Sequence, residues 1–163
     1  DNNYTTVALS RYVTAVASGK KYNYQLMNKI VDADGKTVKK YKADYEDISD
    51  TLTDSQWDAL HSGMRQVVST MDRFQGFDIP VAGKTGTAQQ TGHANHGLFI
   101  GYAPYDDPEI TIAVRIANGY SSHNAATAAR NVISYYYKET SMKDIKEMKA
   151  AGVNGNTRNS VAD

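Results

Sequence analysis

The sequence contains no cysteine, so disulfide bonds, thiolate nucleophiles and cysteine-based zinc sites are excluded. It also lacks an excess of either charge, because 18 acidic side chains balance 18 basic ones. A protein that binds nucleic acid through phosphate contacts needs a basic surface, and so does a polybasic patch for a membrane surface. The balance therefore argues against both. No run of apolar residues approaches the roughly 20 that are needed to span a bilayer.

The residues that are present suffice for one packed domain, since the chain has 163 residues and 40% of them are hydrophobic. Apolar residues recur at helical spacing in several stretches, and residues that favour helix ends flank them. The pair Thr53 and Gln56 has the spacing of a capping box. The predicted helices run from Thr5 or Thr6 to Ser18, from Thr53 to about Thr70, over 123–138 and, as a short segment capped by Ser141, over 141–151.

Other apolar stretches predict strands. Residues 24–30 alternate between apolar and polar side chains, as in a half-buried strand, and Asp34-Gly35 predicts a turn into a return strand at Thr37. Residues 39–51 are charged, which predicts a surface connection. Three more strands are expected at 80–89, 97–103 and 109–117.

The short gaps between these last three strands favour antiparallel neighbours, because a parallel crossover needs a dozen or more residues. We therefore predict an α+β fold, in which helices flank an antiparallel sheet. This domain portion is expected over 1–140. A short helix and a mobile tail rich in Asn and Gly are expected over 141–163.

One strand candidate contains the unusual segment Gly83-Lys84-Thr85-Gly86-Thr87. Glycine weakens a strand and usually marks a place where a ligand or another backbone comes close. In an extended strand, Lys84 and Gly86 lie on one face and the two threonines lie on the other. The lysine offers a positive charge to an anionic substrate, Gly86 leaves room beside the backbone, and Thr85 and Thr87 offer hydroxyls. A plain strand or turn that contains glycine fits the tetrapeptide alone equally well.

The letters Gly-Lys-Thr also end the phosphate-binding P-loop. That signature needs a second glycine five positions before Gly83, where this sequence has Asp78. Pro80 interrupts the segment, and the residues after Thr85 read poorly as the helix that a P-loop opens. We therefore do not expect nucleotide binding.

With its surroundings, the segment resembles the last of three signatures, S-x-x-K, S-x-N and K-T-G, that penicillin-binding transpeptidases and serine β-lactamases share. The stretch from Val81 to Gln89 resembles the form seen in class B penicillin-binding proteins. Six further stretches resemble the family in its own order: Tyr4-Thr5-Thr6 with the helix that follows, Tyr22 to Ile30, the helix with Trp57 and Gly63-Met64-Arg65-Gln66-Val67-Val68, His96 to Pro104, Pro108 to Val114, and Ala125 to Tyr137. The resemblance covers about residues 4–138. It identifies the chain as similar to the C-terminal part of a class B-like D,D-transpeptidase domain.

The other two signatures have only chance-level matches. Ser18-Gly19-Lys20-Lys21 fits S-x-x-K, but in the family this position is a helix end well after the nucleophile. Ser122-His123-Asn124 fits S-x-N, but it follows the K-T-G strand, which the family's motif precedes. We interpret Ser18 as a helix-terminal surface residue and Ser122-His123-Asn124 as the N-terminal cap of the last helix. The nucleophile is then expected outside this chain, which we interpret as a fragment that is inactive alone.

The resemblance implies a serine acyl-enzyme mechanism, in which a serine attacks the carbonyl of a D-Ala-D-Ala stem peptide and an amine of a neighbouring stem completes the cross-link. β-Lactams acylate the same serine. By position, Lys84 would lend positive charge and help the proton relay, and the backbone N–H of Thr87 would be one oxyanion-hole donor. The hydroxyls of Thr85 and Thr87 would hold the substrate carboxylate, and Gly86 would keep the cleft open. The resemblance implies no metal or organic cofactor.

The resemblance also implies a setting. The parent protein is expected at the extracytoplasmic face of the cytoplasmic membrane, held by an anchor that is not in this chain. Its expected partners are peptidoglycan stem peptides, β-lactams, the remainder of its own domain and other cell-wall synthesis proteins, and no nucleic acid. Two alternatives stay open: a β-lactam sensor or β-lactamase on the same fold, and a non-catalytic scaffold domain of the cell-wall machinery.

His93 and His96 invite a metal interpretation. They flank a predicted hairpin between two strands. No carboxylate or third histidine lies nearby in the sequence, so a zinc site with three protein ligands is poorly supported. We expect these histidines to lie in a solvated loop.

Overall fold

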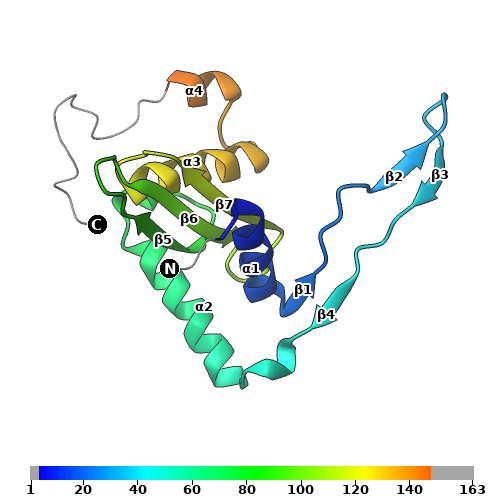
Figure 1. Ribbon diagram of the computed structural model, residues 1–163, viewed down its shortest axis with the longest axis horizontal. Helices are drawn as coiled ribbons and strands as arrows, with labels where there is room; N and C mark the ends of the chain where they lie inside the picture. Colours follow the sequence, from blue (N-terminus) through cyan, green and yellow to red (C-terminus); the bar gives the residue numbers. More distant parts are fainter. Residues whose placement is uncertain (1–3, 148–163) are drawn as a thin grey trace.

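Three antiparallel strands form the central sheet of the structure, a computed structural model that describes residues 4–147. They lie across the sheet in the order β5 (Ala82–Ala88), β6 (His96–Ala103) and β7 (Ile110–Ile116). Helix α3 (Ser122–Tyr136) packs on one face and α1 (Thr6–Ser18) on the other, whereas α2 (Asp54–Ser69) packs along β5 and contributes to the core on both sides (Figure 1). The predicted α+β architecture and the antiparallel order are confirmed.

The first two helices begin and end where their cap residues predict. The Thr5 hydroxyl accepts a hydrogen bond from the Ala8 N–H (3.1 Å) at the start of α1. At the end of α1, Gly19 adopts a left-handed φ of 65°, a conformation that a side chain disfavours. In α2, the Gln56 side-chain oxygen accepts from the Thr53 N–H (2.9 Å), as a capping box requires.

Alternation of side chains along β6 divides the core into two clusters. Phe99, which is fully buried, faces α3, whose alanines let that helix approach the sheet closely. Tyr102, also fully buried, faces the other way and packs with residues of α1 and α2. Burying one large apolar side chain contributes about 1.5–3 kcal/mol. The sheet is therefore held from both sides. The Tyr102 cluster consists of Val13, Val16, Met64, Ala82 and Tyr102.

The buried Tyr102 hydroxyl gives a testable consequence. It has no hydrogen-bond partner among the described residues, and burial raises the pKa of Tyr102 to about 12. The pKa of Tyr102 in the folded chain lies above the unfolded value of about 10. The folded state therefore loses free energy of unfolding, relative to neutral pH, as the pH rises from about 10 towards about 12, because the tyrosine of the unfolded chain ionises first. Replacing Tyr102 with Phe should raise the free energy of unfolding at neutral pH by about 1 kcal/mol and reduce the alkaline loss. Urea unfolding between pH 7 and pH 11.5 measures both effects.

Tyr137 is the matched control. Burial, and then the negative charge of Glu109, raise the pKa of Tyr137 to about 12. Its hydroxyl donates to the Ala103 carbonyl (3.3 Å) and to Glu109 (3.2 Å), so Tyr137→Phe should lower the free energy of unfolding by about 1 kcal/mol. If Tyr102→Phe were as destabilising as Tyr137→Phe, the Tyr102 hydroxyl could not be an unpaired buried group.

A long hairpin projects from the body between α1 and α2 (Figure 1). At its root, β1 (Lys20–Tyr22) pairs with β4 (Tyr45–Asp47), and towards its tip β2 (Lys29–Val31) pairs with β3 (Thr37–Lys40). The predicted turn at Asp34-Gly35 is confirmed, with a φ of 81° at Gly35. We call residues 20–47 the arm.

The arm corrects two predictions. The half-buried strand expected over 24–30 is wrong, because only residues 29 and 30 of that stretch lie in a strand, β2, and Leu26 is fully exposed. The alternation of apolar side chains there has no core to face once the chain leaves the body. The surface connection expected over 39–51 is exposed over most of its length, but it contains the end of β3, all of β4 and the 3₁₀ helix η1 (Ser49–Thr51).

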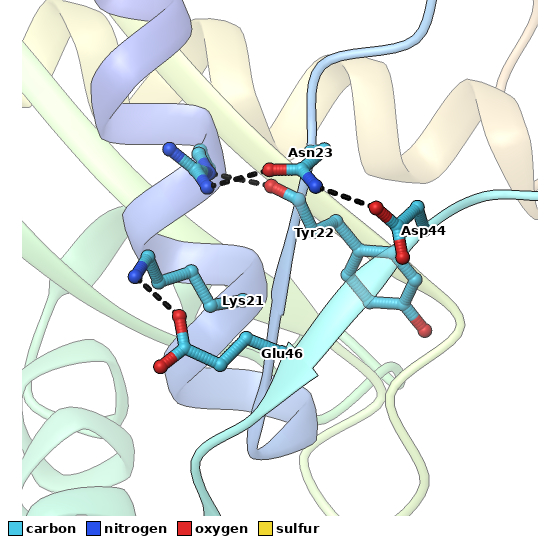
Figure 2. A network of polar contacts seen from close by, with 6 residues as sticks. Lys21, Tyr22, Asn23, Asp44 and Glu46 are labelled. Carbon is cyan, nitrogen blue, oxygen red and sulfur yellow. Dashed lines mark hydrogen bonds and ion pairs between the residues drawn. The ribbon is translucent and has the colours of Figure 1, made fainter.

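Polar contacts fix the root of the arm to α1 (Figure 2). Arg11 of α1 donates to the Tyr22 carbonyl and to the Asn23 side-chain oxygen, and Asn23 donates in turn to Asp44 (2.9 Å). Lys21 of β1 forms an ion pair with Glu46 of β4, the strand it pairs with. This hydrogen bond and the positive charge of Lys21 hold the pKa of Glu46 below its usual value. The arm therefore leaves the body at a defined position.

The C-terminal helices follow the sequence-based expectations within the described range. A second 3₁₀ helix, η2 (Asp72–Phe74), precedes β5, and α4 (Met142–Glu147) follows α3. The Ser141 hydroxyl accepts from the Asp144 N–H (3.2 Å), which is the predicted cap of α4. The predicted continuation to 151 and the predicted mobile tail lie outside the described residues. Within residues 4–147, no helix is long and apolar enough for a membrane crossing.

Candidate active-site strand

The glycine-bracketed lysine segment occupies most of β5, at one edge of the central sheet. On its inner side the strand pairs with β6, with Lys84 opposite Ile100 and Gly86 opposite Leu98. At its start, Arg65 of α2 donates from Nη1 to the Val81 carbonyl (3.0 Å). In the part of the chain that the structure describes, no further strand covers the outer edge of β5.

Alternation along β5 places the four predicted site residues on two faces. Ala82 is buried with α1 and α2, so Lys84 and Gly86 lie on that face of the sheet. Lys84 is exposed, and its Nζ donates to the Thr85 carbonyl (3.1 Å). Thr85, which is half-buried, and Thr87, which is exposed, lie on the opposite face. A lysine charge, a glycine and two hydroxyls are thus presented along one accessible strand edge.

The two glycines of this segment have different causes. A Cβ at Gly83 would lie 2.4 Å from the Phe99 ring and 2.7 Å from the Ile100 carbonyl oxygen, so the packing of the chain itself requires glycine there. A Cβ at Gly86 would meet only the Leu98 Cβ, at an ordinary 3.5 Å. The protein's own packing does not require glycine at 86. The two glycines therefore differ in how tightly the chain itself packs around them.

A polar network fixes the turn that follows β5. The Gln90 side-chain amide donates to the Ala94 carbonyl (2.8 Å) and to the Asn118 side-chain oxygen (2.8 Å). The Asn118 backbone N–H donates to Nδ1 of His96 (3.0 Å), so Nδ1 is the acceptor nitrogen of that ring. The end of the candidate strand is therefore tied to β6 and to the loop after β7.

The network corrects the expectation for one of the two histidines. His93 is exposed in the loop, as expected, but His96 is half-buried and begins β6. Among residues 4–147, no group of three or more His, Cys, Asp or Glu side chains could hold a metal ion. Lys84 and Thr85 lie inside a strand, whereas a P-loop needs them at the start of a helix.

The structure does not bring the two chance-level serines to this strand as a catalytic set. Ser18 ends α1, where its hydroxyl donates to the Thr14 carbonyl (2.7 Å), and Lys21 is paired with Glu46. The interpretation of Ser18 as a helix-terminal residue fits this geometry.

The predicted cap at Ser122 needs a correction of one residue. The cap is Ser121, whose hydroxyl accepts from the His123 N–H (3.1 Å), whereas Ser122 is the first helical residue and is 1% exposed. Sequence alone could not separate two adjacent serines. Gly97 lies close to this helix start, since a Cβ there would come within 2.4 Å of the Ser121 carbonyl oxygen and 3.5 Å of the Ser122 Cα.

Sequence analysis missed two residues that position the strand, Arg65 and Gln90. Arg65 lies within the stretch Gly63 to Val68 that carried part of the family resemblance, but nothing in its spacing showed that it would reach Val81. Gln90 follows the motif directly, yet its partner Asn118 is far along the chain. Contacts of this kind leave no periodic signal in a sequence.

Comparison with known proteins identifies the family to which the chain belongs. Residues 2–134 match the penicillin binding protein transpeptidase domain. The peptidoglycan D,D-transpeptidase MrdA of Haemophilus influenzae is 29% identical over 158 residues, which cover 83% of this chain and 24% of that protein. The chain thus spans about a quarter of the length of this curated relative.

Solved structures agree with the sequence comparison. Pseudomonas aeruginosa PBP2, solved in complex with WCK 5153, matches with a TM-score of 0.66 and 30% identity, over 82% of this chain and 30% of that one. Penicillin-binding protein A of M. tuberculosis, solved as an imipenem acyl-enzyme complex, matches in fold with a TM-score of 0.72 at 20% identity, over 82% and 31% of the two chains. The chain belongs to the family of penicillin-binding protein transpeptidase domains.

Proposed function

We propose that the chain is part of a peptidoglycan D,D-transpeptidase and that β5 forms one wall of its active site. The observation that carries this proposal is the contrast between the two glycines. Gly83 is explained by packing, whereas Gly86 leaves open space beside an exposed lysine, on a strand edge that no further strand of residues 4–147 pairs with. A relative named as a D,D-transpeptidase and a solved neighbour described as a β-lactam acyl-enzyme support it.

Each site residue then has a role. Lys84 supplies positive charge to an anionic substrate and takes part in proton transfer to the acyl-transfer centre. The backbone N–H of Thr87 donates to the oxyanion of the tetrahedral intermediate. The hydroxyls of Thr85 and Thr87 bind the substrate carboxylate, and Gly86 lets the substrate backbone approach. The stem peptide D-Ala-D-Ala and β-lactams are the proposed ligands, and no cofactor is required.

The nucleophilic serine of this mechanism lies outside the chain in our proposal. Ser18 is the last residue of α1 and Ser122 the first residue of α3. The chain covers only about a third of the solved relatives. The parent protein then acts in the cell envelope, at the extracytoplasmic face of the cytoplasmic membrane. Its proposed partners there are the rest of its own domain and other cell-wall synthesis proteins.

Labelling with a fluorescent penicillin tests the proposal. We expect the parent protein to form a covalent adduct that unlabelled β-lactam blocks, and the 163-residue chain alone to remain unlabelled. Labelling of the isolated chain would show that its nucleophile is present here. A parent protein that takes no label would instead be a non-catalytic scaffold, and rapid loss of the label by hydrolysis would indicate a β-lactamase.

A further inference from the structure

The arm and the segment that follows it carry three different surfaces. Residues 29–42, which we call the basic tip, contain five lysines and two aspartates. Residues 44–58, which we call the acidic root, lead back into the body and contain six acidic side chains and no lysine or arginine (Figure 1). Between β1 and β2 lie Leu26 and Met27, the apolar middle, which are exposed. We propose that the arms of two copies of this chain pair side by side in opposite directions, with each basic tip on the acidic root of the other copy.

The basic tip is unfavourable for the chain on its own. Lys29 and Lys40 stand directly opposite each other in the β2–β3 pairing, where like charges destabilise a hairpin. All residues of β2 and β3 are exposed, so neither face of this small sheet packs on a core. A two-stranded hairpin is marginally stable in water unless another surface packs on it. An acidic polypeptide surface would supply both the opposite charge and the missing contacts.

The acidic root has the complementary charge. Asp54 and Asp58 are four residues apart on α2, so they share one helix face and repel each other. Asp50 of η1 adds a further exposed carboxylate beside the start of that helix. The single ion pair within residues 4–147 joins Lys21 to Glu46, so no basic side chain of that range neutralises these three aspartates. A basic surface from another molecule would relieve their repulsion.

A second copy of the chain satisfies both charged surfaces in one interface. A two-fold axis perpendicular to the arms, through their middles, carries each basic tip to the other copy's acidic root, as in an isologous dimer. The same axis brings Leu26 and Met27 against their counterparts, which gives an apolar centre with charged ends, the common anatomy of a protein interface. An anionic polymer would neutralise only the tip and would leave the acidic root unpaired.

The root of the arm is already ordered for such a contact. Arg11 of α1 holds Tyr22 and Asn23, and Lys21 pairs with Glu46 (Figure 2). A surface whose position is fixed before association loses less conformational freedom when it binds. The arm therefore presents its tip, middle and root to a second copy at a small entropic cost.

Charge reversal at the two ends tests the pairing. A tip variant carries Lys29→Glu and Lys40→Glu, and a root variant carries Asp50→Lys, Asp54→Lys and Asp58→Lys. Sedimentation equilibrium measures the dimer dissociation constant of the 163-residue chain and of the parent protein. Each variant alone should dimerise about tenfold more weakly, because like charges then meet across the interface. An equimolar mixture should restore the original affinity, because each altered surface then faces an opposite charge in the other variant.

A matched control changes charge away from the arm. Lys143→Glu with Lys146→Glu on α4 alters the net charge as much as the tip variant does and should leave the dissociation constant unchanged. A mixture that dimerises no more tightly than either variant alone would overturn the proposal. So would a chain that stays monomeric up to about 1 mM, since the arm would then serve a different partner. Dimerisation of the isolated chain but not of the parent would also overturn it, because the contact would then use a surface that the parent covers.

Discussion

Replacing Lys84 with Ala should slow penicillin acylation of the parent transpeptidase at least about 100-fold, because proton transfer by a positioned side chain contributes roughly 10²–10⁴ in rate. The expected effect on folding is small. Lys84 is exposed, and its Nζ contact with the neighbouring Thr85 carbonyl is a local one. The acylation rate constant with a fluorescent penicillin, together with the unfolding midpoint in urea, separates the two effects.

Two further lysine variants sharpen the result. Lys84→Arg keeps the positive charge but not the readily transferred proton, so a large loss in this variant would assign proton transfer to Lys84, and near-complete activity would assign only charge. Lys36→Ala removes another exposed lysine, at the tip of the arm, and should leave the acylation rate unchanged. An acylation rate in Lys84→Ala that matches the Lys36→Ala rate would remove Lys84 from the proposed site.

The position of the candidate strand could be predicted from sequence because its signals are local. Helix ends depend on residues close together in the sequence, such as Thr53 and Gln56 at the start of α2. Gly19 ends α1 as expected. Three strands with short gaps leave little choice but antiparallel pairing. The lysine motif therefore lies on a strand that the sequence predicts, whereas the position of this strand at the edge of the sheet is known only from the structure.

The features that the sequence could not predict depend on tertiary contacts. The alternation of residues 24–30 is typical of a half-buried strand, but burial needs a core, and the arm carries these residues away from it. In the same way, Arg65 and Gln90 position the candidate strand through partners that are distant in the sequence. The two glycines of the motif look alike as letters, and only the neighbours of each one distinguish packing from an open site.

A pair of alanine substitutions tests that distinction. Gly83→Ala forces a methyl group to within 2.4 Å of the Phe99 ring and 2.7 Å of a backbone oxygen. Overpacking of this kind costs about 1–3 kcal/mol, and the backbone contact leaves little freedom to relax, so we expect a loss of about 3 kcal/mol in the free energy of unfolding. Urea unfolding of the 163-residue chain measures it.

Gly86→Ala should behave in the opposite way. Its methyl group makes one ordinary contact with Leu98, and alanine is favoured over glycine in a strand by about 0.5–1 kcal/mol, so stability should stay level or rise. In the parent protein, the same methyl group would occupy the room proposed for the substrate and lower the acylation rate about tenfold, equivalent to about 1.4 kcal/mol. A stable Gly86→Ala parent that acylates at the full rate would show that β5 does not line the active site at this residue. Loss of stability in Gly83→Ala with loss of reactivity in Gly86→Ala would show that the two glycines of this strand serve the fold and the chemistry separately.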